Sequence, residues 1–171
     1  MLKIDIAFRL NDIDFTFKAD VKRGEVYTFN AGEPILADKL FWVLCGLDKN
    51  YKGTIEGEGI CFNASTFNNV LALGDRTMFI RGSVERNIYK ALRVRAGRKT
   101  ALQRTQEVIG LYNLQKLAKL NIKLLEDEEL LTVALARAHF RKIGLLVYKK
   151  LGNNAEFDFT KFADSYILVI S

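Results

Sequence analysis

The chain has 171 residues, of which 49% are hydrophobic and 27% charged, and its formal net charge is +6. This balance is typical of a globular domain that buries most of its apolar surface, and it excludes a disordered or low-complexity chain. With one proline and twelve glycines there is no room for a flexible linker, so we expect residues 1–171 to form a single domain.

The N-terminus gives no sign of secretion or membrane insertion. Its first ten residues, MLKIDIAFRL, alternate apolar and charged side chains and lack the unbroken apolar core of a signal peptide. No apolar run approaches the roughly 20 residues that span a bilayer. We therefore expect a cytoplasmic protein, whose only membrane contact would be peripheral and on the inner face of the cell membrane.

Few residues are suited to metal binding or nucleophilic catalysis. Cys45 and Cys61 do not stand in a metal-ligand spacing, and we interpret both as buried free thiols. His139 is the only histidine, so a His-based metal site or a Ser-His-Asp site has little support, and we place it on a helix flank. We expect no metal and no cofactor.

The first half of the chain predicts strands around one helix. Residues 2–8 and 13–17 alternate with period two and form a hairpin that turns at Asn11 and Asp12. A short strand, a helix that Gly46 stops, and two more strands follow, at residues 25–29, 37–47, 53–62 and 70–73.

The second half is richer in helices. The apolar spacing predicts helices at residues 84–95, 98–111 and 114–120 and a longer one in ELLTVALARAHFRK. Two apolar strands, IGLLVY and YILVIS, come last, with a polar helix-like stretch between them. Alternating strands and helices indicate an α/β fold with a mainly parallel sheet.

Four stretches give this order of elements a family resemblance over roughly residues 1–151. TVALARAHFR at 132–141 resembles the helix that follows the LSGGQ signature of the ATP-binding-cassette (ABC) ATPases, and IGLLVY stands where their Walker B strand lies. GEVYTF and WVLCGL resemble the flanks of the family's phosphate loop, and GTIEGEGI and MFIRGSVERNI resemble the strands and the Q-loop region between them. The N-terminal hairpin is similar to that of the molybdate-type importer ATPases.

The resemblance implies an α/β P-loop NTPase core of the ABC ATPase type. It implies a mainly parallel sheet in which GEVYTF and IGLLVY are neighbouring central strands, together with an N-terminal antiparallel hairpin. It also implies a helical subdomain inserted at about residues 84–125.

The same resemblance fixes where nucleotide-binding groups would stand, and the first window reads AGEPILADK at 31–39. A phosphate loop uses glycine N–H groups, a lysine and a hydroxyl to hold phosphates and magnesium. Ala31, Pro34 and Leu36 stand at the glycine positions, Ala37 at the lysine position and Asp38 at the hydroxyl position. These residues predict that phosphate binding is lost.

Two further motifs depart from the family in the same way. The signature is replaced by LEDEE, so that Glu126, Asp127 and Glu128 stand where a γ-phosphate would dock, and acidic groups there also suit a helix N-terminus. Lys149 and Lys150 replace the Walker B aspartate and the following glutamate, and ammonium groups cannot bind Mg²⁺. The family's switch histidine would follow YILVIS, where the given sequence stops, and we expect it to be missing.

We therefore interpret the chain as a pseudo-ATPase with no catalytic residue, acting as a binding or regulatory component of a transporter-like complex. One alternative is a residual nucleotide-binding ATPase or sensor that holds phosphates with Lys39, Lys149 or Lys150. Another is a nucleic-acid-associated cassette domain, which the basic pI of 9.3 permits but which no interleaving of aromatic and basic residues supports.

The expected partner is a protein, either a membrane permease or an active ABC ATPase subunit. In the family the region after the Q-loop meets the permease, and here that region carries the basic run KALRVRAGRKTALQR. A solvated surface is the alternative interpretation of this run. The candidate contact residues are Asp75, Phe79, Arg93, Arg95, Arg98 and Lys99.

Overall fold

The computed structural model describes residues 1–58, 60–61, 69–74, 76–150 and 157–171. The chain divides into two compact units, the first formed by Met1–Leu73 with Lys142–Ser171 and the second by Gly74–Arg141. Each unit has its own cluster of buried hydrophobic side chains. The second unit contains the whole segment 84–125 for which the sequence predicts a helical insertion.

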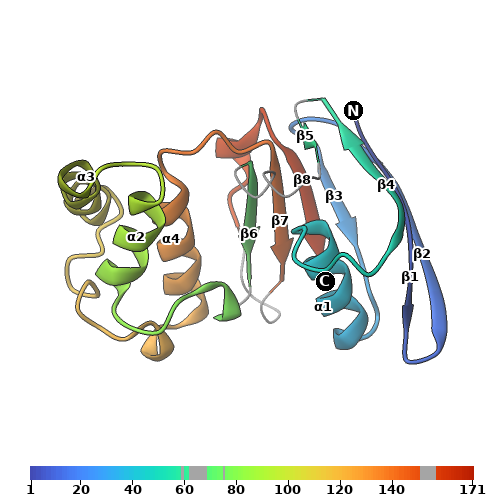
Figure 1. Ribbon diagram of the computed structural model, residues 1–171, viewed down its shortest axis with the longest axis horizontal. Coiled ribbons are helices and arrows are strands. Elements are labelled where there is room, and N and C mark those ends of the chain that lie inside the picture. The colour runs from blue at the N-terminus through green and yellow to red at the C-terminus, as the bar shows by residue number, and fades with distance from the viewer. Residues whose placement is uncertain (59, 62–68, 75, 151–156) are drawn as a thin grey trace. The chain divides into compact units, whose positions relative to one another are not determined.

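An antiparallel sheet of four strands forms one layer of the first unit (Figure 1). It contains β1 (Leu2–Leu10), β2 (Ile13–Val21), β4 (Lys52–Gly57) and β5 (Ile60–Cys61), in the order β2-β1-β4-β5. Positive φ angles of 49° at Asn11 and 65° at Asp12 close the predicted hairpin, since these residue types tolerate that conformation. The strand predicted at 53–62 is two paired strands, and Phe62 lies outside the described residues.

A parallel sheet forms the other layer and confirms the predicted mainly parallel arrangement. Its strands are β3 (Val26–Phe29), β8 (Tyr166–Ile170), β7 (Leu145–Lys149) and β6 (Val70–Leu73), and they pair in this order. The expectation that GEVYTF and IGLLVY are neighbours is wrong, because β8 lies between β3 and β7. All five residues of β8 are buried, as suits an interior strand, whereas β3 is partly exposed and lies at the edge of the described sheet.

Helix α1 (Pro34–Leu44) lies between the two sheets (Figure 1). It buries Leu40, Phe41, Val43 and Leu44 against both of them. The helix begins three residues earlier than the predicted start at residue 37, because the fixed φ of Pro34 suits the first helical position. Gly46, with a φ of 71°, follows its C-terminal cap as predicted.

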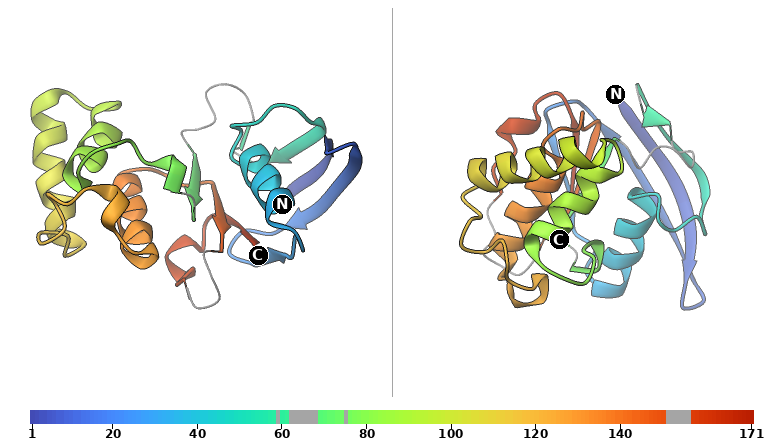
Figure 2. Two further views of the ribbon diagram at one scale, coloured as in Figure 1. Left: turned by 90° about the horizontal axis from the view of Figure 1, so that it is seen from below. Right: turned by 60° about the vertical axis from the view of Figure 1, so that its left-hand side comes forward.

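The second unit is helical (Figure 2). Helix α2 (Val84–Arg93) packs against both α3 (Arg98–Leu111) and α4 (Asp127–Ala138), and short 3₁₀ turns lie at Arg76–Met78 and Ile122–Leu124. The helix predicted at 114–120 is wrong: this segment is a series of turns closed by i to i+3 bonds, after Asn113 leaves the helical region with a φ of 55°.

The segment before the last strand is described only in part. Of the polar helix-like stretch predicted there, residues 151–156 lie outside the described residues, and Thr160–Phe162 form one 3₁₀ turn. Phe157, Phe159 and Phe162 gather with Tyr148 of β7, with ring centroids 4.9 to 6.1 Å apart. In the part of the chain that the structure describes, no helix has the length and apolar character needed to cross a membrane.

Candidate functional site

The loop between β3 and α1 is short and uses its own N–H groups. The Ala31 N–H donates to the Ser171 carbonyl at 2.8 Å, and the Gly32 N–H donates to Asn30 Oδ1 at 2.9 Å. The helix is already formed at Pro34, so the Ala37 N–H donates to the Glu33 carbonyl at 3.0 Å, as in any helix. The backbone therefore turns directly into α1, and these three donors are directed to acceptors within the protein.

A cavity of about 360 Å³ lies beside this loop, within the first unit. Its wall combines the start of α1 with the ends of β7 and β8, and it carries two carboxylates and two ammonium groups. The lining residues are Asn30, Gly32, Glu33, Pro34, Ala37, Asp38, Lys149, Lys150, Ile170 and Ser171. The structure thus brings together Pro34, Ala37 and Asp38 of the predicted phosphate-loop positions with both predicted Walker B positions, Lys149 and Lys150. Ala31 and Leu36 do not line the cavity and pack in the hydrophobic core of the first unit.

Two of the lining residues, Asp38 and Lys149, form an ion pair. Lys149 Nζ at the end of β7 lies 2.6 Å from Asp38 Oδ1 in α1. The Lys149 side chain is 18% exposed and the Asp38 side chain 54%, so the pair reaches from the protein interior to the surface. The Lys149 ammonium also lies 5.3 Å from the centroid of the Phe41 ring, a distance at which the ring face attracts a cation.

The side chains at this place do not suit a magnesium ion. Mg²⁺ requires several oxygen ligands in near-octahedral geometry. Asp38 offers one carboxylate that is already paired with Lys149, and a second cation beside the ammonium group would be repelled. Among the described residues there is also no cluster of three or more His, Cys, Asp or Glu side chains that could hold a metal ion.

Lys39, which sequence reasoning considers as a substitute phosphate ligand, points elsewhere. Its Nζ lies 2.6 Å from Asp48 Oδ2, and the two side chains are only 14% and 25% exposed. The hydrogen bond from Lys39 lowers the pKa of Asp48 below its ordinary value. Lys39 is therefore part of a pair that ties α1 to the segment after it, and it does not line the cavity.

The acidic residues at the start of α4 have local structural partners. The Glu126 N–H donates to Glu129 Oε2 at 2.9 Å, which is half of a capping box. Asp127 Oδ1 lies 2.7 Å from Arg76 Nη2, while Glu128 is exposed in the first turn. Carboxylates at a helix N-terminus favour the helix dipole, so all three residues stabilise α4.

Arginine side chains are partly buried at the other end of α4. Arg137 Nη1 donates to the Met78 carbonyl at 2.9 Å, and its guanidinium lies 4.9 Å from the centroid of the Phe79 ring. Burial lowers the pKa of Arg137. Burial, together with the nearby charges of Arg95 and Arg137, lowers the pKa of Arg141 to about 10. Phe79 thus packs beneath an arginine of its own unit.

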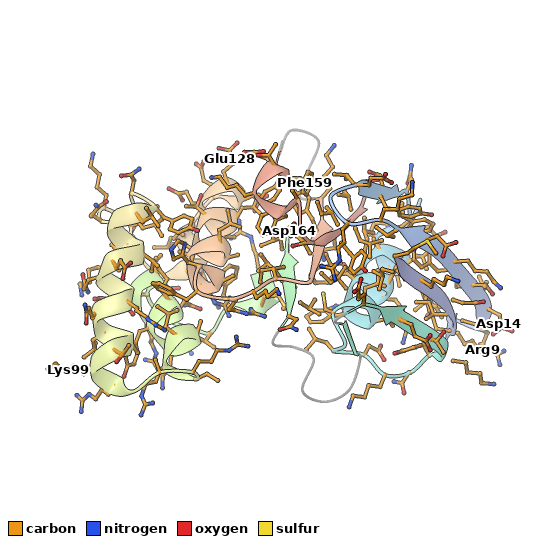
Figure 3. All side chains as sticks on the ribbon, turned by 90° about the horizontal axis from the view of Figure 1, so that it is seen from above. Arg9, Asp14, Lys99, Glu128, Phe159 and Asp164 are labelled. Atoms are coloured by element: carbon orange, nitrogen blue, oxygen red, sulfur yellow. The ribbon has the colours of Figure 1, made fainter. Side chains whose placement is uncertain are left out.

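The predicted partner-contact residues form an exposed basic segment around the junction of α2 and α3. Arg93, Arg95, Arg98 and Lys99 are all exposed, and Val94 among them is 83% exposed. Figure 3 shows Lys99 pointing away from the helical unit. No acidic residue occurs from residue 86 to 106. Asp75, the remaining candidate, lies outside the described residues.

The remaining sequence predictions concern thiols and the histidine. Cys45 is buried as predicted, while the Cys61 side chain lies outside the described part of the structure. His139 is the exposed C-terminal cap of α4, and its Nδ1 lies 3.2 Å from the Tyr112 hydroxyl. It contacts only neighbouring aromatic rings and that hydroxyl among the interactions described for it.

Several residues of the site escaped sequence reasoning, and three of them contact the loop or the ion pair. Phe41 faces the Lys149 ammonium, Asn30 accepts the Gly32 N–H, and Ser171 accepts the Ala31 N–H. Only Asn30 carries a signal in the sequence, because an asparagine two residues before a glycine favours a local side-chain turn. The other two are placed by the fold.

No protein-family model matches the sequence, and no curated protein matches it. Among solved structures, the chain is similar to cbiO1 from Clostridium perfringens, part of the ABC transporter complex cbiONQ, with a TM-score of 0.67 and 16% sequence identity over 99% of this chain and 77% of that chain. It is also similar to the dimeric post-hydrolysis structure of the ATP-binding cassette MJ0796 bound to ADP and Pi, with a TM-score of 0.67 and 14% identity over 99% of this chain and 87% of that chain.

These similarities confirm the fold that the sequence resemblance implies. The chain has the α/β fold of an ABC ATPase domain, with a parallel P-loop-type sheet, an antiparallel N-terminal hairpin and a helical unit.

Proposed function

We propose that the chain is a non-catalytic, ABC ATPase-like subunit that acts by binding another protein of a transporter-like complex. The observation that carries this proposal is the loop from Asn30 to Glu33. A phosphate loop exposes backbone N–H groups to its ligand. Here the Ala31 and Gly32 N–H groups bond to Ser171 and Asn30, and the helix has begun before Ala37.

The charges around the cavity support the same proposal. Glu33 and Asp38 repel phosphate, and Lys149, the cation nearest to Asp38, is already paired with it. Lys149, the last residue of β7, and Lys150 occupy the aligned Walker B positions, and their ammonium groups neither bind magnesium nor activate water.

A titration calorimeter tests the loss of nucleotide binding. We expect no heat of binding when Mg-ATP is added to the full chain up to millimolar concentration, and no release of phosphate. A sub-millimolar Kd, which is more than about 4 kcal/mol of binding free energy, would refute the proposal in favour of a residual nucleotide sensor. The variant Ala37→Lys should not restore binding, because it replaces only one of the missing groups.

The partner-binding half of the proposal is supported by the exposed basic segment, Arg93 to Lys99. Arginine and lysine side chains without acidic neighbours in the sequence favour an acidic partner surface. The exposed Val94 adds apolar area to the same segment. cbiO1 is itself part of an ABC transporter complex, which makes a permease or an ATPase subunit the partner class that we propose here.

Charge reversal tests this contact. The variant with Arg93, Arg95, Arg98 and Lys99 changed to glutamate should lose at least ten-fold in recovery of the partner protein from the native host. A matched control reverses four exposed lysines of the first unit: Lys3, Lys49, Lys52 and Lys161. Unchanged recovery with the first variant would leave a solvated surface as the explanation. If the first variant recovers less membrane or nucleic acid but the same amount of every protein, the segment binds that other partner instead.

A further inference from the structure

The pair between Asp38 and Lys149 joins two positions that the resemblance aligns with magnesium-binding residues of the family. The resemblance places a magnesium-binding hydroxyl at Asp38 and a magnesium-binding aspartate at Lys149. In this chain both side chains are charged: the carboxylate stands on helix α1 and the ammonium at the end of strand β7. Their atoms meet at 2.6 Å, within hydrogen-bond distance.

We infer that the Lys149 ammonium takes the place of the metal ion and forms an internal cation that links α1 to β7. The carboxylate of Asp38 and the ammonium of Lys149 neutralise each other, so the pair requires no ligand from solution. This inference rests on the proposed function and deepens it, because it states how the site is held together without Mg-ATP.

Burial explains why the lysine is the fixed member of the pair. Its side chain is only 18% exposed, and the other four residues of β7 are buried. The ammonium lies over the Phe41 ring at 5.3 Å, which provides a second favourable contact for a cation. A charge in such a place is costly unless it is paired. Asp38 is the carboxylate that pairs with it.

The geometry has a consequence for divalent cations. A divalent cation that approached Asp38 would have to displace the Lys149 ammonium. The two positive charges repel each other, and the ammonium cannot diffuse away because it is part of the chain. The variant Lys149→Asp removes this obstacle and places a second carboxylate opposite Asp38, while Glu33 lines the same cavity. Two or three carboxylates around one cavity suit a hard divalent cation.

A Mn²⁺ titration followed by electron paramagnetic resonance tests the inference. We expect the wild-type chain to bind Mn²⁺ at least ten-fold more weakly than Lys149→Asp. The further change Asp38→Asn in that variant should remove the gain. The matched control is Lys150→Asp, which makes the same charge change at the adjacent cavity residue and should not create a site that depends on Asp38.

Two results would overturn the inference. One is Mn²⁺ binding by the wild type that equals that of Lys149→Asp. The other is a gain in Lys149→Asp that survives Asp38→Asn.

A double-mutant cycle keeps the inference testable if Lys149→Asp does not fold. Asp38→Asn, Lys149→Met and the double variant are compared by urea unfolding. We expect the two changes to be coupled by at least about five-fold in the folding equilibrium constant, and additive effects would contradict the link. Mg-ATP binding by the wild type would instead refute the proposed function and leave the coupling between the two residues standing.

Discussion

Arg76 and Asp127 form an ion pair with 2.7 Å between Nη2 and Oδ1, and Arg76 Nη1 also donates to the Leu125 carbonyl at 3.1 Å. One guanidinium thus holds both the residue before the capping box and the first residue of α4. Asp127 belongs to the segment LEDEE, which the sequence resemblance aligns with the family's signature, and its carboxylate has a structural partner inside its own unit.

Removal of this guanidinium should weaken the start of α4. We expect Arg76→Ala to lower the free energy of unfolding by about 1 kcal/mol. The ion pair is roughly half exposed and contributes little by itself, so most of this loss would come from a weaker start of the helix. Urea unfolding monitored by circular dichroism provides the measurement. Arg81→Ala, at an exposed arginine for which no ion pair is described, should change stability by less than half as much.

Asn87 should be far less tolerant of substitution. Its side chain is 1% exposed; its Oδ1 accepts from the Ile80 N–H at 2.9 Å, and its Nδ2 donates to the carbonyls of Ile80 and Ser83 at 2.9 and 3.0 Å. Asn87→Ala removes all three bonds and takes the side-chain partner from both the N–H and the carbonyl of Ile80, at a cost of about 2 to 4 kcal/mol. The exposed Asn50→Ala is the control. Equal midpoints for the two variants in thermal unfolding would contradict the assigned role.

The pair of Lys39 with Asp48 predicts a pH dependence. The hydrogen bond from Lys39 lowers the pKa of Asp48 in the folded state, so its stabilising effect is present above the unfolded pKa of about 3.9 and is lost as the pH falls through the lower, folded value. Asp48→Asn should therefore cost about 1.5 to 3 kcal/mol at pH 7, as expected for a hydrogen bond to a charged group. The cost should shrink at acid pH.

The measurement for Asp48 is urea unfolding between pH 7 and pH 2. The control is Asp5→Asn, because the pair of Asp5 with Lys18 is 60% and 67% exposed and should contribute little at any pH. A cost for Asp48→Asn that stays constant over this pH range would show that the carboxylate charge is not the cause.

Two glycines should respond in opposite ways to alanine. A Cβ at Gly53 would lie 2.0 Å from the Asp5 carbonyl oxygen, and its φ of 106° is unsuitable for an L side chain, so Gly53→Ala should cost at least 3 kcal/mol or prevent folding. Gly110 lies inside α3 with nothing within 4 Å of its Cβ position. Gly110→Ala should raise stability by up to about 1 kcal/mol. Thermal unfolding of both variants checks this, and a loss of stability in Gly110→Ala would contradict it.

The amino-acid sequence by itself determined the local elements of this protein. Period-two alternation and the Asn11-Asp12 turn predicted the hairpin, and the apolar spacing predicted α2, α3 and α4. These features depend on neighbouring residues, whose periodicity matches the local geometry of strand or helix. Some of the residues that line the cavity, Asp38 and Lys149 among them, could also be assigned, because the resemblance aligned them with known positions of a fold.

Only the tertiary structure decided which of these elements and side chains meet. The place of β8 between β3 and β7 depends on pairing between strands far apart in the chain, and local sequence patterns do not predict which strands pair. The bond between Lys149 and Asp38 likewise joins residues 111 positions apart, and neither local sequence pattern predicts that they meet. Side-chain pairing of this kind is set by how strand ends and helix starts come together, and so the sequence indicated two unsuitable residues, whereas the fold made them an ion pair.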